Sequence, residues 1–131
     1  MKTICIGIYC FFTIALHAQH SVPTDTVVLF FTDEEQRIFR KLGPKHLQIT
    51  NYAGNTLLLR LSSDVAGPGE KDVIIHSPEK KVFLFPEKIA NIYITINPDS
   101  KKPAKRTLYR NGKYELFYNQ FEKLYDIMQG E

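Results

Sequence analysis

The chain has 131 residues, of which 44% are hydrophobic, 12% aromatic and 24% charged. This composition excludes a disordered or low-complexity chain, and the length favours one domain. The 17 basic and 14 acidic residues give a formal charge of +3, which is too small by itself to indicate a nucleic-acid-binding or membrane-surface protein.

The first 18 residues are typical of a secretory signal peptide. Lys2 gives a positive start, Ile4–Leu16 is apolar and uncharged, and Ala18 is a small residue suited to cleavage. We therefore expect residues 1–18 to be removed and residues 19–131 to form a single β-rich extracytoplasmic domain. The protein is expected in the periplasm, in the medium or at the cell surface.

Two alternatives remain for this leader segment. Cleavage after Ala15 competes with cleavage after Ala18, and a membrane anchor competes with a signal peptide. A membrane-spanning helix needs about 20 apolar residues, and this run is shorter, which favours the signal peptide. No other stretch of the sequence approaches that length, so we expect no transmembrane helix after cleavage. Cys5 and Cys10 both lie in the segment. The mature chain is therefore expected to have no disulfide, thiolate metal site or cysteine nucleophile.

A strand and a helix are predicted at the start of the mature domain. Thr26–Phe31, with the sequence TVVLFF, is β-branched and aromatic and predicts a buried strand. Thr32 and Glu35 follow with the spacing of a helix capping box. We expect a short helix near 33–42. A strand over residues 37–41 is the alternative, because tertiary contacts override the propensity of short helices.

Six further runs with strand character occur in pairs, each pair flanking a turn. The pairs are His46–Asn51 with Thr56–Ser62, Lys81–Phe85 with Ile89–Ile96, and Arg106–Arg110 with Lys113–Phe117. The first and third pairs predict β-hairpins, the third because Asn111–Gly112 favours a two-residue turn. One more strand, Asp72–His76, follows a glycine-rich loop over residues 63–72.

The C-terminal segment is predicted to be helical. Its apolar side chains recur at helical spacing, and they are Phe117, Phe121, Leu124, Tyr125 and Met128. We expect a helix near 119–128 that ends before Gly130. The whole mature chain is therefore expected to be mainly β, as a sandwich or small barrel of about seven strands with a short helix near each end.

Two segments resemble strand pairs of immunoglobulin-like modules of bacterial envelopes. KHLQITNYAGNTLLLRLS resembles their adjacent-strand pair, and KVFLFPEKIANIYITIN is similar to their later pair, where a turn led by proline returns the chain. The resemblance implies an immunoglobulin-like sandwich and no particular function, because many unrelated proteins share such strand chemistry. The tryptophan and cysteine pair of antibody domains are missing from the mature sequence.

The histidines do not have the spacing of a metal site. His17 is expected to leave with the signal peptide, and His20 lies next to the expected new N-terminus. His46 and His76 lie at the ends of predicted strands, far apart in the sequence. Because no His-x-x-x-His or His-x-His motif occurs, we expect no metal ion and no cofactor.

The loop over residues 63–72 offers one possible catalytic group. It carries Asp64, Glu70 and Asp72, from which a pair of carboxylates could be assembled for glycosidase-like chemistry. Charged loop residues are more commonly only solvated, and nothing in the sequence sets the separation of these acids. No nucleophile motif is present elsewhere, so no catalytic residue is assigned.

A basic run is the most asymmetric feature of the sequence. It contains six cations and no acid, and these are Lys101, Lys102, Lys105, Arg106, Arg110 and Lys113. Tyr109 and Tyr114 are expected to face each other across the Asn-Gly hairpin. Such a surface suits an anionic glycan or an acidic protein face, whereas a merely solubilising edge hairpin is the alternative.

The sequence therefore predicts a non-catalytic exported module that binds or assembles with another component of the cell envelope or surface. The contact surface is expected to be the basic hairpin or an exposed sheet edge. An envelope or surface protein and an anionic glycan are the expected partners, and nucleic acid is not expected because the signal peptide directs the protein away from it. The alternative is a small secreted hydrolase or inhibitor that uses the loop over residues 63–72.

Overall fold

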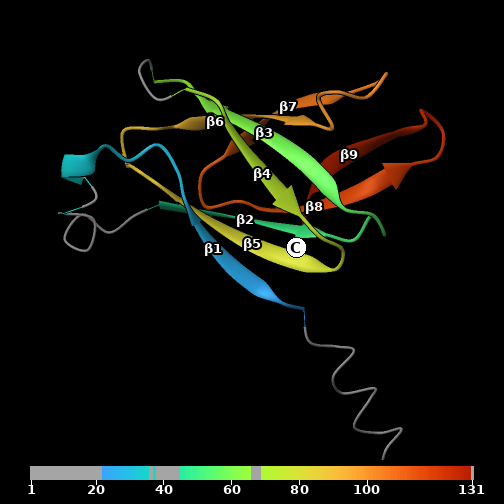
Figure 1. Ribbon diagram of the computed structural model, residues 1–131, viewed down its shortest axis with the longest axis horizontal. Helices are drawn as coiled ribbons and strands as arrows, with labels where there is room; N and C mark the ends of the chain where they lie inside the picture. The colour runs from blue at the N-terminus through green and yellow to red at the C-terminus, as the bar shows by residue number, and fades with distance from the viewer. Residues whose placement is uncertain (1–21, 36, 38–44, 66–68, 131) are drawn as a thin grey trace, which may run out of the picture.

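The computed structural model describes residues 22–35, 37, 45–65 and 69–130. In this part of the chain, nine strands form two sheets that face each other as a sandwich (Figure 1). One sheet has the strand order β1-β5-β2-β8-β9 and the other β4-β3-β6-β7. The strands are β1 (Thr24–Val28), β2 (Lys45–Asn51), β3 (Leu57–Ser63), β4 (Lys71–Ile75), β5 (Glu79–Phe85), β6 (Asn91–Ile96), β7 (Ala104–Tyr109), β8 (Lys113–Asn119) and β9 (Leu124–Gln129).

The expected mainly β sandwich is confirmed, and its core lies between the two sheets. Successive residues of a strand point to opposite faces, so every second side chain enters the core. The two sheets contribute alternating aliphatic and aromatic side chains that are almost completely buried, among them Leu57, Leu59, Leu61, Ile92, Ile94, Ile96, Phe83 and Phe85. The shared face predicted for the three isoleucines of β6 is therefore the core face.

The two predicted hairpins do not form, because each turn carries the chain from one sheet to the other. β2 and β3 lie in different sheets, as do β5 and β6, and β7 and β8. β2 pairs instead with β5, and β3 with β6, both antiparallel. A turn that crosses between sheets and a turn within a hairpin join similar strands, so the sequence pattern did not separate them.

The Asn-Gly turn forms locally although the hairpin does not. Asn111 has a positive φ of 63°, and the Gly112 N–H donates to the Tyr109 carbonyl at 3.3 Å. A Cβ at Gly112 would lie 2.5 Å from the ring of Tyr114, so the close approach of this ring requires glycine. After the turn, β8 pairs in parallel with β2, whose Gln48 N–H donates to the Gly112 carbonyl.

The helix predicted near 119–128 is wrong, because this segment contains a turn and most of β9. The Asn119 side chain accepts hydrogen bonds from the N–H groups of Phe121 and Glu122, at 3.0 and 3.1 Å. Lys123 has a φ of 55°, which completes a four-residue loop between β8 and β9. Two antiparallel strands therefore replace the helix.

Tyr125, one of the residues whose spacing predicted the helix, takes part in a cross-strand pair. Tyr118 and Tyr125 are directly opposite each other in the β8–β9 pairing. Their ring centroids are 4.9 Å apart with an edge-to-face angle of 64°. Leu124 and Tyr125 are neighbours in β9 and point to opposite faces, so the spacing that predicted a helix does not mark one face of the hairpin.

β1 differs from the buried strand predicted over residues 26–31. It spans Thr24–Val28 and lies at the edge of its sheet, in parallel pairing with β5. Most of its side chains are exposed, whereas Leu29 and Phe30, which follow it, are buried in the core. The apolar run was thus correctly identified as core-forming in its second half only.

The capping box of the first predicted helix is present. The Glu35 N–H donates to the Thr32 hydroxyl at 3.1 Å, and the Thr32 N–H donates to the Glu35 carboxylate at 3.2 Å. Residues 33–35 and 37 are helical, and the rest of the segment to residue 42 lies outside the described residues. The predicted signal peptide lies outside them too. Within the described part, no helix has the length and apolarity to cross a bilayer.

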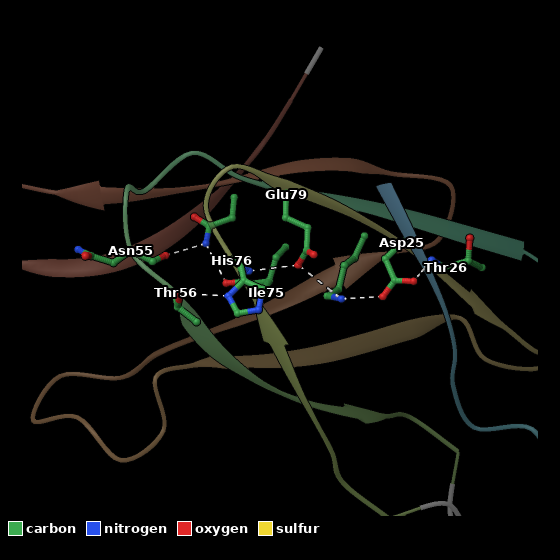
Figure 2. A network of polar contacts seen from close by, with 9 residues as sticks. Asp25, Thr26, Asn55, Thr56, Ile75, His76 and Glu79 are labelled. Carbon is green, nitrogen blue, oxygen red and sulfur yellow. Dashed lines mark hydrogen bonds and ion pairs between the residues drawn. The ribbon is translucent and has the colours of Figure 1, made fainter. Parts of the chain in front are cut away.

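Asn51, at the end of β2, is a buried polar group that organises one end of the sandwich. Its side chain is 0% exposed. Its amide group donates to the carbonyl oxygens of Asn55 and Ile75, at 2.9 and 3.1 Å, and Figure 2 labels these two acceptor residues. Its amide oxygen accepts the Ala53 N–H at 2.9 Å. One side chain therefore holds the β2–β3 turn against the end of β4 in the other sheet.

Lys81 of β5 is a second buried polar side chain, with 7% of the residue exposed. Its ammonium nitrogen lies 2.9 Å from the Asp25 carboxylate and 3.5 Å from that of Glu79 (Figure 2). Burial alone lowers the pKa of Lys81, but the hydrogen bond with Asp25 and the charges of both acids outweigh burial and raise it. The hydrogen bond with Lys81 in turn lowers the pKa of Asp25.

Replacement of Asn51 is expected to weaken the fold severely. Asn51→Ala leaves the Ala53 N–H and the carbonyls of Asn55 and Ile75 without their side-chain partner, which should lower the free energy of unfolding by about 2–4 kcal/mol. Denaturant titration measures this change. Gln48→Ala, at a half-buried position of the same strand, is the control and should cost much less. Equal losses in the two variants would contradict the role given to Asn51.

The Asp25–Lys81 pair is expected to stabilise the fold at neutral pH and to lose this effect in acid. A carboxyl whose pKa is lower in the folded state stabilises the fold above its ordinary pKa of about 4, and this contribution is lost as the pH falls through the folded value. Asp25→Asn should therefore reduce the difference in unfolding free energy between neutral and acidic pH. Denaturant titrations at a series of pH values measure this difference. If the unfolding free energy of the variant depended on pH as it does in the unaltered protein, the pair would not form.

Candidate functional site

The six cations of the predicted basic patch do not form one surface. β6 and β7 are antiparallel, so the β6–β7 loop and the β7–β8 turn lie at opposite ends of the sandwich. Lys101 and Lys102 belong to the loop, whereas Arg110 and Lys113 flank the turn. Cations that are close together in the sequence are therefore separated in space by the length of β7.

Two of the arginines are held by contacts within the protein. The Arg106 guanidinium lies 2.8 Å from the Asp126 carboxylate, and this ion pair joins β7 of one sheet to β9 of the other. Arg110 donates to the Glu87 carbonyl at 3.3 Å. Lys105 is exposed, and as the neighbour of Arg106 in a strand it points to the opposite face. Arg106 is therefore a residue that stabilises the fold.

The two tyrosines of the predicted patch have different environments. Tyr109 is 63% exposed, whereas Tyr114 is buried in the core. The Tyr114 hydroxyl accepts the Tyr109 N–H at 3.0 Å. The two residues are thus in contact through one backbone hydrogen bond, but their rings are not the cross-strand pair that was predicted.

A pocket of about 510 Å³ opens at the end of the sandwich that carries Lys101 and Lys102. The β6–β7 loop lines one side and the β8–β9 hairpin lines the other. We call it the lysine–tyrosine pocket, after the side chains that determine its chemistry, which are Lys101, Lys102, Lys123, Tyr118 and Tyr125. A more open hollow adjoins it, shares the three lysines and adds Phe121 and Glu122.

The tyrosine side of the pocket is fixed by the buried Asn51. The Tyr125 hydroxyl accepts a hydrogen bond from the Asn55 side-chain amide at 2.6 Å. The Asn55 carbonyl is itself held by Asn51. Tyr125 then contacts the ring of Tyr118 edge to face. A continuous series of contacts therefore connects the interior of the sandwich with the pocket wall.

The lysine side is fixed by the β6–β7 loop. The Asn97 N–H donates to the Leu58 carbonyl at 2.8 Å, and the Asn97 side chain accepts the Leu58 N–H at 3.2 Å. The Ser100 N–H and hydroxyl both donate to the Asn97 carbonyl. Lys102 then donates to the Glu122 carbonyl at 3.3 Å, which links the loop to the β8–β9 hairpin. The two walls are thus joined to each other.

The pocket has an excess of positive charge. In the described part of the chain, none of its three lysines forms a side-chain ion pair, and Glu122 is the acid that lines the adjoining hollow. The lining also contains the aromatic rings of Tyr118 and Tyr125 and the aliphatic side chain of Leu124. Cations beside aromatic and aliphatic groups suit a ligand with an anionic group on a less polar body.

The acids of the loop over residues 63–72 are largely occupied by Arg60. The Arg60 guanidinium donates to both oxygens of Asp72, at 2.9 and 3.3 Å, and lies 3.7 Å from Glu70. The hydrogen bond with Arg60 lowers the pKa of Asp72 and keeps it ionised. Asp64 is exposed, and residues 66–68 lie outside the described residues. These contacts describe a cross-strand ion pair, and nothing in them favours the hydrolase interpretation.

The histidines of the described residues lie at strand ends, as predicted. His46 is exposed near the start of β2, and His76 follows β4 with its Nδ1 3.2 Å from the Thr56 hydroxyl. Among the described residues, no three histidine, cysteine or acidic side chains are grouped so that they could hold a metal ion.

Sequence reasoning missed the residues on the hairpin side of the pocket. Tyr118, Lys123 and Tyr125 were assigned to a helix or to its approach, which separated them from Lys101 and Lys102. The signal that could have found them is Asn119, because asparagine favours turns and would have divided the segment into two strands. Comparisons with models of known protein families, with curated proteins and with solved structures found no match for this chain.

Removal of the Tyr125 hydroxyl tests the connection between the core and the pocket. Tyr125→Phe leaves the Asn55 amide without this partner and should lower the free energy of unfolding by about 1 kcal/mol. Tyr52→Phe, at an exposed tyrosine of the β2–β3 turn, is the matched control and should have almost no effect. Denaturant titration of both variants measures the difference. If the two variants were equally stable, the Asn55–Tyr125 hydrogen bond would not support the pocket.

Proposed function

We propose that this protein is a non-catalytic exported module that binds an anionic component of the cell envelope or surface in the lysine–tyrosine pocket. The observation that carries the proposal is the group of three lysines around a fixed pair of tyrosine rings. Export rests on the signal-peptide pattern of residues 1–18, and the pocket supplies the binding chemistry.

In the described part of the chain, two of the pocket lysines take no part in structural ion pairs, a property they share with Lys105 and Lys113 outside the pocket, so their distinguishing feature is the neighbouring pair of tyrosine rings. Cations that stabilise the fold are in ion pairs with acids of neighbouring strands or loops, as for Arg60, Lys81, Lys88 and Arg106. Lys101 and Lys123 have no such partner in the described chain. Their charges are therefore available to an anionic ligand without the loss of a structural contact.

The chemistry of the pocket defines the ligand class. Lysine ammonium groups bind phosphate, sulfate or carboxylate groups, and tyrosine rings pack against the less polar faces of sugars or other planar groups. An anionic glycan and the acidic face of an envelope or surface protein both supply such groups. Because an exposed site in water is screened by salt, the interaction is expected to weaken as the ionic strength rises.

Reversal of charge in the pocket should abolish most of the binding. The probe is a sulfated polysaccharide. Lys101→Glu combined with Lys123→Glu should raise its dissociation constant about tenfold or more at low salt, because two attractive charges become repulsive. Isothermal titration calorimetry measures the affinity, and a neutral polysaccharide is the reference probe. Lys102 is left unchanged because it connects the two pocket walls.

The matched control for this experiment lies outside the pocket. Lys105→Glu combined with Lys113→Glu changes the net charge of the protein equally, at exposed positions on β7 and β8. This variant should retain most of the affinity. Equal losses in the two double variants would show that only the net charge matters, and absence of binding by the unaltered protein would overturn the proposal for this ligand class.

A further inference from the structure

The tip of the β8–β9 hairpin carries an apolar side chain directed into solvent. Phe121 is 99% exposed, which makes it the most exposed large apolar residue of the described chain. The adjoining hollow brings Phe121 together with Lys101, Lys102 and Lys123. A fully exposed aromatic ring has no packing role within the protein, so its position beside cations calls for an external partner.

This tip is held in one conformation by local contacts. The Asn119 side chain accepts the N–H groups of Phe121 and Glu122, and Lys102 donates to the Glu122 carbonyl. The backbone of Phe121 and Glu122 is therefore joined to Asn119 at the end of β8, and Glu122 is also joined to the β6–β7 loop. The ring is therefore carried by a turn whose backbone is already hydrogen-bonded before a partner binds.

We infer that the lysine–tyrosine pocket and Phe121 together dock on an anionic lipid bilayer, with the Phe121 ring inserted between lipids and the lysines on lipid phosphate groups. This inference rests on the proposed function and identifies its ligand. Aromatic side chains favour the boundary between headgroups and hydrocarbon, and each lysine near an anionic leaflet adds attraction. Both kinds of side chain lie at the same end of the sandwich.

The arrangement favours a bilayer over a soluble anion as the partner. A soluble anion would engage the lysines but would leave Phe121 in water, whereas a bilayer offers phosphate groups and an apolar layer at adjacent depths. The β6–β7 loop also contains Asp99, and the β8–β9 loop contains Glu122, so each loop carries one acid beside its lysines. Three lysines and two acids give the two loops together a net charge of +1.

A single-tryptophan probe tests insertion directly, because the chain contains no tryptophan. In the purified mature protein, Phe121→Trp should show a blue shift of its emission with vesicles of phosphatidylglycerol and phosphatidylcholine, and little shift with phosphatidylcholine alone. Tyr109→Trp, at an exposed aromatic position near the opposite end of the sandwich, is the matched control. It should show no shift with either vesicle.

Vesicle sedimentation separates this inference from the proposed function. Phe121→Ser should weaken binding to anionic vesicles about tenfold and leave binding to the sulfated polysaccharide unchanged, because only the bilayer offers an apolar partner. Lys123→Glu should weaken both interactions. Circular dichroism of each variant verifies that the fold is retained.

The combined results distinguish the lipid inference from the proposed function. If the polysaccharide binds through the pocket lysines but anionic vesicles do not bind, the lipid inference is overturned and the proposed function stands. Vesicle binding that is unaffected by Phe121→Ser, or an equal blue shift at both tryptophan positions, also overturns insertion. If neither probe binds, both the inference and the proposed function are wrong.

Discussion

The buried hydrogen bonds of Asn51 are the constraint on which one end of this sandwich depends. A polar side chain without access to water must satisfy its donors and acceptors inside the protein, and Asn51 does so with the β2–β3 turn and with the end of β4. The turn carries the chain between the sheets, so the hydrogen bonds that satisfy the buried Asn51 side chain also join the two layers. Asn55 extends this arrangement to Tyr125, and the pocket is therefore built on the interior of the protein.

The crossing of the chain between the sheets explains where the candidate site lies. The chain also reverses direction at each connection from β2 to β9, so successive loops lie alternately at the two ends of the sandwich. β8 runs parallel to β2, so the β8–β9 hairpin is at the end where β2 finishes, beside the β6–β7 loop. Lysines from one segment and tyrosines from another thus meet around one pocket, while Arg110 and Lys113 are carried to the far end. The candidate site is a product of this topology.

Local patterns in the sequence were reliable where the physical cause is local. The capping box at Thr32 and Glu35, the turn at Asn111 and the alternating isoleucines of β6 all depend on neighbours within a few residues, and the structure contains each of them. The two hairpins and the C-terminal helix failed because strand partners are chosen by distant segments. Tyr125 fits helical spacing in the sequence and a cross-strand pair with Tyr118 in the fold, and only the available partner strand decides between the two.

The sequence by itself determined the fold class, the apolar side chains of most strands, the places where the chain turns, and the existence of a concentration of lysine and arginine. Those properties follow from side-chain chemistry and short-range backbone preferences. The tertiary structure alone decided which strands pair, which cations form ion pairs such as Arg106–Asp126, and which lysines lie beside aromatic rings. The reason is physical. The relative free energies of contacts between segments far apart in the chain decide which strands pair and which side chains are buried, and a local sequence pattern does not contain this information.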